Sequence, residues 1–349
     1  MSFLRRVPRS TTSPNGGGKR IEIKSCPGGP RMRAADIKNL YKVNKCYDLP
    51  KEDNGNRFLN NLMLTHNIVT NMKDTTDKIL MELGTGPGSL TRSLLTRPSR
   101  GVLGVELDTR YNSYLESIQR HTRHKFRWCN ADAMNMDEPQ VLREAFPEMA
   151  SSIARPWASP ASVLVVSSLP FRLQSQLLVK YALEASRKSG LYSLGSVHLR
   201  VTIQQEVAEC ICAVQSTTPF GMLSVVMQNY FSCHIESVIK GEKCYPYAAV
   251  NIAVLTLVPR PVPLVEIDGA ALLTFATSQM QRSRWDVEKG LLKCMPPEVA
   301  AFILREVGVD PRVNLRDLSG TTIAKMALLW VRFLEATNQP VPDVSKLKE

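Results

Sequence analysis

A glycine-rich turn is the first feature of this sequence whose residue types and spacing could do chemistry. Residues 82–88 are Glu-Leu-Gly-Thr-Gly-Pro-Gly, between an apolar run typical of a strand and a segment typical of a helix. At Gly84 and Gly86 no side chain covers the backbone, and the first turn of the next helix offers N–H groups without intrahelical partners. An ordinary strand-to-helix connection explains three glycines as well, so the turn alone marks only a place where a ligand could bind.

Two acidic residues follow this turn at the spacing that a nucleotide-like ligand needs. Glu106 closes the next predicted strand, about twenty residues beyond the turn, where a carboxylate can accept hydrogen bonds from ribose hydroxyls. Asp132 follows the strand after that, where its carboxylate could accept from an adenine amino group. A helix N-cap explains Asp132 alone equally well. Together with the turn, the two acids favour a nucleotide-containing cofactor at the ends of three strands.

A tetrapeptide further along the chain separates the cofactors that this spacing leaves open. Ser168-Leu169-Pro170-Phe171 follows a predicted strand and fits the pattern Asn/Asp/Ser, apolar, Pro, aromatic, which is typical of methyltransferases that act on exocyclic amines. The Ser168 hydroxyl and the Leu169 carbonyl would accept hydrogen bonds from an adenine N6 and so localise its lone pair. Pro170 would stiffen the turn, and Phe171 would stack on an unpaired base. The alternative is a plain strand-ending turn with a core phenylalanine.

Alternating strands and helices must position these residues, and the apolar periodicity predicts where they lie. The βαβ spacing predicts an α/β fold with a parallel sheet, whose last two strands form an antiparallel hairpin at its edge. The expected strands are residues 79–83, 101–106, 125–129, 162–166, 198–204, 232–240 and 250–258. The expected helices are residues 34–41, an apolar series from 58 to 69, and residues 89–95, 270–281, 297–307 and 321–336.

The chain is predicted to have three parts. Residues 1–33 form a basic arm, residues 34–258 the α/β domain, and residues 259–349 a small helical domain. The net charge is +12, and residues 1–57 contain thirteen Lys or Arg against five Asp or Glu. The first twenty residues are basic, without acids and rich in Ser and Thr, which is typical of a mitochondrial transit peptide. A disordered basic arm is the alternative, because prolines and glycines weaken an amphipathic helix there.

Composition excludes several classes of protein. The 8 cysteines form no Cys-x-x-Cys pair, so a zinc site is not expected. Several cysteines lie inside apolar runs, where a buried thiol is the ordinary interpretation, and no disulfides are assigned. The longest apolar runs are far too short to span a bilayer.

Further motifs resemble the KsgA-type ribosomal RNA adenine dimethyltransferases, with a likeness from about Arg33 to Trp330. The segments that carry it, besides the turn and the tetrapeptide, are residues 55–59, 205–209, 220–225 and 245–250. The resemblance implies a Rossmann-like S-adenosylmethionine-dependent methyltransferase sheet followed by a small helical domain. It also implies cofactor contacts from Arg57, Leu59, Glu82, Gly84, Gly86, Glu106, Asp132 and Ser168. Departures from the family pattern are Asn56, Arg57, Ser168 and Asn251.

The resemblance implies dimethylation of adjacent adenines in small-subunit ribosomal RNA during assembly of the small ribosomal subunit. It further implies a monomer in the mitochondrial matrix without a metal. The basic residues that could contact RNA are Arg172, Lys180, Arg187, Lys188, Lys240, Lys243, Arg282 and Arg284.

Three other functions compete with this one. The departures at Arg57 and Ser168 leave open an assembly factor without catalysis, and some relatives of this fold serve as mitochondrial transcription factors. An NAD-dependent oxidoreductase would use the glycine turn and Glu106, but it leaves the tetrapeptide without a role.

Overall fold

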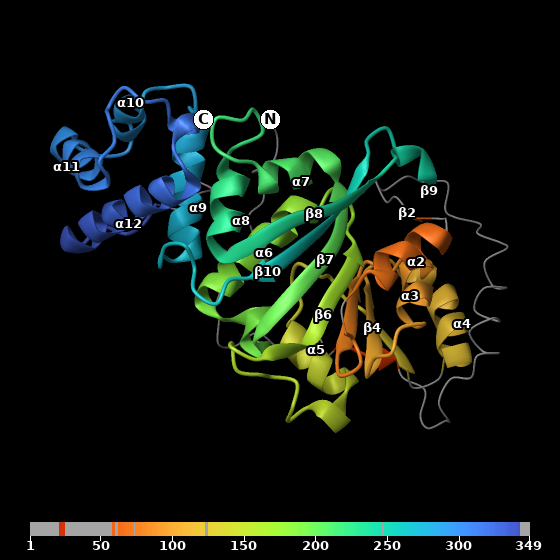
Figure 1. The fold of residues 1–349 in the computed structure, drawn as a ribbon. Helices are drawn as coiled ribbons and strands as arrows, with labels where there is room; N and C mark the ends of the chain where they lie inside the picture. Colours follow the sequence, from red (N-terminus) through yellow and green to blue (C-terminus); the bar gives the residue numbers. More distant parts are fainter. Residues whose placement is uncertain are drawn as a thin grey trace.

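An eight-stranded mixed sheet forms the centre of the protein, seen in a computed structural model (Figure 1). The structure describes residues 21–24, 58–59, 62–72, 74–122, 125–245 and 248–342. The strand order is β1-β5-β4-β3-β6-β7-β10-β8, and β2 and β9 form a separate two-stranded sheet. The strands are β1 (Ile23–Lys24), β2 (Phe58–Leu59), β3 (Ile79–Leu83), β4 (Gly101–Glu106), β5 (Phe126–Asn130), β6 (Pro160–Ser168), β7 (Ser196–Gln204), β8 (Phe231–Ile239), β9 (Cys244–Tyr245) and β10 (Ile252–Pro259).

Helices cover both faces of the parallel strands, which explains why β3 and β4 consist of buried residues throughout. One apolar cluster joins one face to α2, α3 and α4, through residues such as Ile68, Leu90 and Leu115. A larger cluster joins the other face to α5, α6, α7 and α8. These helices are α2 (Leu62–Thr70), α3 (Ser89–Leu94), α4 (Asn112–Thr122), α5 (Glu138–Ala145), α6 (Gln174–Arg187), α7 (Gln205–Cys212) and α8 (Met222–Tyr230).

The predicted strands of the large sheet are confirmed, each to within two residues at either end. Strands β3 to β7 are parallel neighbours, and β8 pairs antiparallel with β10 at the edge, as expected. The helix expected from residue 58 is wrong at its start, because Phe58 lies in β2 and α2 begins at Leu62. The helix expected at residues 34–41 lies outside the described residues.

Four helices follow β10, namely α9 (Gly269–Met280), α10 (Val287–Leu291), α11 (Pro297–Val307) and α12 (Gly320–Ala336). Three of them were predicted to within one residue, whereas the five residues of α10 are too few to show a helical period. Figure 1 shows this group beside α8, at the opposite end of the molecule from α2 to α4. One apolar cluster runs from the sheet into these helices, so the division at residue 259 stays a proposal. No helix among the described residues is long and apolar enough to cross a membrane.

The end of the predicted basic arm takes part in the sheet. Strand β1 pairs antiparallel with β5, and Gln119 Nε2 donates a hydrogen bond of 2.7 Å to the carbonyl of Lys24. Ile21 and Ile23 are half-buried against the core, which gives this short segment a reason to dock. The arm predicted at residues 1–33 therefore contains two residues that belong to the central sheet.

The described cysteines are buried or partly buried and are not joined in disulfides. Cys129, Cys210, Cys212 and Cys233 are thiols, and burial raises the pKa of Cys129 to about 12. Over the described ranges, no group of three or more His, Cys, Asp or Glu side chains is placed to hold a metal ion.

Candidate active site

The turn between β3 and α3 has a backbone that only glycine adopts readily. Gly84, Gly86 and Gly88 have φ angles of +72°, +53° and +83°, and at these angles a Cβ atom is strained. At Gly88 a Cβ would also lie 2.2 Å from Ile118 Cδ1. The glycine spacing is thus required by the local fold as well as by any ligand.

Glu106, the last residue of β4, faces this turn. Its carboxylate accepts hydrogen bonds from the Gly86 N–H at 2.6 Å and from the Asp108 N–H at 2.8 Å. Burial raises the pKa of Glu106, and the two backbone hydrogen bonds partly oppose that effect. The predicted acid and the predicted turn are therefore in direct contact.

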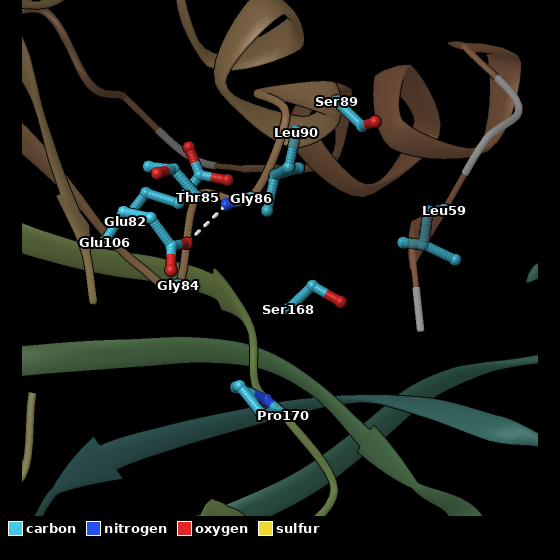
Figure 2. A pocket seen from close by; sticks show the side chains of 10 residues that line it. All are labelled: Leu59, Glu82, Gly84, Thr85, Gly86, Ser89, Leu90, Glu106, Ser168 and Pro170. Atoms are coloured by element: carbon cyan, nitrogen blue, oxygen red, sulfur yellow. Dashed lines mark hydrogen bonds between the residues drawn. The ribbon is translucent and has the colours of Figure 1, made fainter. Parts of the chain in front are cut away.

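A pocket opens where the turn, the end of β4 and the end of β6 meet. Figure 2 shows Leu59 across the pocket from Glu106, with Ser168 between them. The pocket is small, about 50 Å³, and partly open, so a nucleoside-sized ligand would extend beyond it. The residues that line the pocket are Leu59, Glu82, Gly84, Thr85, Gly86, Ser89, Leu90, Glu106, Ser168 and Pro170.

Two features of the pocket wall suit a polar ligand. Thr85 Oγ1 is buried and has no hydrogen-bond partner within the described part of the chain, so a ligand could satisfy it. A Cβ on Gly84 would lie 3.5 Å from Pro170 Cδ, in the space between the turn and the tetrapeptide. A side chain at residue 84 would therefore fill the narrow gap between the two predicted motifs, both of which line the pocket.

The tetrapeptide is held in place by backbone hydrogen bonds on both sides. The Leu169 N–H donates to the Thr202 carbonyl in β7 at 3.1 Å, and the Pro170 carbonyl accepts from Leu173 at 2.9 Å and Gln174 at 3.2 Å. Ser168 is half-buried and lines the pocket. The turn that carries the predicted amine acceptors is thus fixed between β6, β7 and the start of α6.

Comparison with known proteins decides between the families that this geometry allows. A family model for ribosomal RNA adenine dimethylase matches residues 48–330. The chain belongs to this family. Among its relatives, dimethyladenosine transferase 1, mitochondrial, of Homo sapiens is 28% identical, over 85% of this chain and 84% of its own length. The Vermamoeba vermiformis protein of the same name is 24% identical, over 82% of this chain and 92% of its own.

Solved structures share the fold of this family member. A dimethyladenosine transferase from Plasmodium falciparum superposes with a TM-score of 0.60 at 15% identity, covering 78% of this chain and 96% of its own. The 23S rRNA methyltransferase ErmE gives 0.52 at 20% identity, covering 78% and 98%. The predicted resemblance and the Rossmann-like α/β fold class are confirmed.

One described residue that was predicted to contact the cofactor, Asp132, is not among those that line the pocket. The Asp132 carboxylate accepts hydrogen bonds from the Met134 N–H at 2.9 Å and from Asn135 Nδ2 at 2.6 Å, so here it stabilises its own loop. The alternative interpretation of Asp132 was a helix N-cap. The residue does accept a backbone hydrogen bond as a cap would, but it caps a turn and not a helix. Arg57 lies outside the described residues. Contacts from both residues to a cofactor stay predictions.

Several pocket residues escaped the sequence analysis. Thr85, Ser89 and Leu90 line the pocket because they belong to the glycine turn and the first turn of α3, and their position in the motif was the available signal. Leu107 directly follows Glu106 and is 63% exposed, but it is not one of the residues that line the pocket.

The predicted RNA-contacting residues divide by environment. Lys180 is the least accessible candidate, because its side chain is 16% exposed and its Nζ lies 2.6 Å from Glu138 Oε1. Arg187 is half-exposed and pairs with Asp268 at 2.6 Å. The other exposed side chains remain candidates, namely Arg172, Lys188, Lys240, Lys243 and Arg284. Arg282 stays a prediction as well.

A buried carboxyl beneath the turn predicts a pH-dependent stability. Burial raises the pKa of Glu82 to about 8, opposed by a 2.6 Å hydrogen bond from Thr91 Oγ1 and reinforced by Glu106. Between its ordinary pKa of 4.5 and about 8, the folded protein keeps a proton that the unfolded chain releases. The free energy of unfolding should therefore fall as pH rises through this window.

Glu82→Gln is expected to remove that penalty while keeping an acceptor for Thr91. Urea unfolding measures the free energy of unfolding of both proteins at pH 5 and pH 8. The difference, variant minus parent, should be at least about 1 kcal/mol larger at pH 8 than at pH 5. The exposed Glu116→Gln variant is the control and should track the parent. A constant difference between Glu82→Gln and the parent at both pH values would contradict the assignment.

Proposed function

We propose that this protein transfers methyl groups from S-adenosylmethionine to the N6 amines of adjacent adenines in the small-subunit ribosomal RNA of mitochondria. Membership of the ribosomal RNA adenine dimethylase family gives the reaction class. The observation that carries the finer proposal is the placement of Ser168 and Glu106 on one pocket beside the glycine turn. One side of this pocket suits a ribose and the other suits an amine.

The cofactor side depends on Glu106 and the glycine backbone. A carboxylate has about four lone-pair sites, and Glu106 uses two of them for Gly86 and Asp108. The Leu107 N–H also hydrogen-bonds this carboxylate, and the lone pairs that the backbone leaves open would accept from ribose hydroxyls. S-adenosylmethionine supplies an activated methyl group, so the protein has mainly to orient the two reactants.

The amine side depends on the tetrapeptide. Ser168 Oγ and the Leu169 carbonyl would accept the two N6 protons of the target adenine, which directs the nitrogen lone pair at the methyl group. The fixed backbone of Leu169 keeps its carbonyl in position before the base arrives. Phe171 is half-buried against the core, and its ring would stack on a base taken out of its helix.

The compartment and the partner rest on the relatives and on charge. Relatives of this chain carry the word mitochondrial in their names, and the basic N-terminal sequence is typical of import into the matrix. A net charge of +12 favours a polyanionic partner such as ribosomal RNA in an assembling small subunit. We further propose that the protein acts as a monomer without a metal.

A second candidate function follows from Ser168 itself. The family motif has a carboxamide where this chain has one short hydroxyl, so a protein that binds the subunit without catalysis would tolerate the change. Such an assembly factor would bind the same RNA and transfer nothing.

Methyl transfer to a fragment of unmodified small-subunit ribosomal RNA distinguishes the two functions. The protein is incubated with labelled S-adenosylmethionine, and the RNA is digested and examined by mass spectrometry for dimethyladenosine. A fragment with the adjacent adenines replaced by guanines is the control and should gain no label. Tight binding of the unmodified fragment without any transfer would favour the assembly factor.

A further inference from the structure

A hollow on the helical group combines an exposed tryptophan with basic side chains. Trp285, between α9 and α10, is 41% exposed, and Leu292 beside it is 44% exposed. The hollow is shallow and widely open, with a volume of about 570 Å³. Its lining is Arg284, Trp285, Asp286, Lys289, Leu292 and Lys293. We call it the Trp285 hollow.

The indole of Trp285 sits on a fixed backbone. The Trp285 N–H donates to the Arg282 carbonyl at 2.8 Å, and the Trp285 carbonyl accepts from Leu315 at 3.1 Å. The Arg282 guanidinium lies 5.4 Å from the ring centroid. The inner face of α10 is buried, and a Cβ on Gly290 would lie 2.7 Å from Leu315 Cδ1, so the helix is packed tightly. A ligand would therefore meet a preorganised aromatic surface.

The charge of the hollow favours an anionic ligand. Lys289 pairs with Asp286 at 2.7 Å, which uses the one carboxylate of the lining. Arg284 and Lys293 are exposed and form no ion pair within the part of the chain that the structure describes. Cations beside an exposed aromatic ring are the combination that binds unpaired nucleotides, because the ring stacks on a base and the cations meet phosphates.

We propose that the Trp285 hollow binds an unpaired nucleotide of the RNA substrate, with its base on the Trp285 indole and flanking phosphates on Arg284 and Lys293. This inference rests on the proposed function for the identity of the RNA. Figure 1 shows α10 at the far end of the molecule from α3, which directly follows the glycine turn. The hollow would therefore hold the RNA at a distance from the reacting adenine, strengthening binding without assisting methyl transfer.

Binding of single-stranded oligouridylate, and of the unmodified ribosomal RNA fragment, tests the proposal by fluorescence anisotropy of labelled RNA. Trp285→Ala should weaken binding of both at least about fivefold, the loss expected for one stacked base. Trp285→Phe keeps an aromatic face and should retain most of the affinity. Phe302→Ala is the matched control, since Phe302 is 44% exposed on α11 with Arg305 beside its ring, outside the hollow.

Two further measurements separate RNA contact from a general effect on the fold. In a plot of the logarithm of the RNA-binding constant against the logarithm of salt concentration, the double variant Arg284→Ala/Lys293→Ala should have a slope smaller in magnitude by about 1.4. Trp285→Ala should raise the KM for RNA and leave kcat and S-adenosylmethionine affinity unchanged. If the parent transfers no methyl groups, the proposed function fails while the anisotropy still tests the hollow.

Equal losses in Trp285→Ala and Phe302→Ala, or parent-like RNA binding by Trp285→Ala, would overturn the proposal. If Trp285→Ala bound RNA as the parent does but no longer bound the small ribosomal subunit, the partner of the hollow would be a protein and the proposal would be overturned.

Discussion

Glu106→Ala is expected to weaken S-adenosylmethionine binding at least about a hundredfold, since each hydrogen bond to a charged acceptor contributes about 1.5–3 kcal/mol. The variant loses the acceptor for the ribose hydroxyls. It also leaves the Gly86 and Asp108 N–H groups without the partner they have at 2.6 Å and 2.8 Å. Isothermal titration calorimetry of parent and variant measures the loss directly.

The neighbouring carboxylate supplies a matched control. Asp108 lies two residues beyond Glu106, and its carboxylate is engaged by Arg110 at 2.6 Å, away from the pocket lining. Asp108→Asn keeps an acceptor oxygen and should bind the cofactor as the parent does. Thermal unfolding without cofactor shows whether Glu106→Ala disturbs the turn itself. Undiminished binding by a folded Glu106→Ala variant would remove the cofactor role from this residue.

Local sequence signals predicted the part of the site that depends on the central strands. The bounds of β3 and β4 coincide with the prediction, because both are buried apolar runs ended by glycine or an acid. Parallel pairing then brings their carboxyl ends together, and so Glu106 meets the glycine turn. Ser168 joins them because β6 pairs with β3 on its other side.

What depends on loop conformation or on distant partners was not predictable. Asp132 could cap a turn or face a ligand, and only the path of residues 132–136 decides which donors reach it. Lys180 has the sequence context of a surface residue, yet Glu138, far away in the chain, buries it in an ion pair. Trp285 gave no signal, because α10 is too short for a helical period.

Two consecutive serines at the end of β6 allow the amine-acceptor role to be separated from a structural one. Strand geometry directs them to opposite faces. Ser167 is buried and its hydroxyl donates to the Leu83 carbonyl, whereas Ser168 lines the pocket. Ser167→Ala and Ser168→Ala each remove one hydroxyl group, on opposite faces of the strand.

Ser168→Ala is therefore expected to lower kcat for methyl transfer about a hundredfold, the loss typical of one preorganised transition-state hydrogen bond. S-adenosylmethionine affinity should fall far less than kcat, because Glu106 and the turn remain. Ser167→Ala should instead lower the free energy of unfolding by about 1 kcal/mol and leave kcat unaltered. Single-turnover methylation and urea unfolding of the three proteins provide both quantities.

Ser168→Asn decides what the departure from the family motif means for this chain. The carboxamide offers an acceptor oxygen on a longer side chain, so a working enzyme should remain active in this variant. An active parent that loses its rate only in Ser168→Ala assigns the hydroxyl to the amine. An inert parent rescued by Ser168→Asn would show that the serine ended catalysis, because the acceptor would then be the one missing part. In that case the pocket would still bind the cofactor, and the protein would act as the assembly factor that binds the RNA without transferring methyl groups.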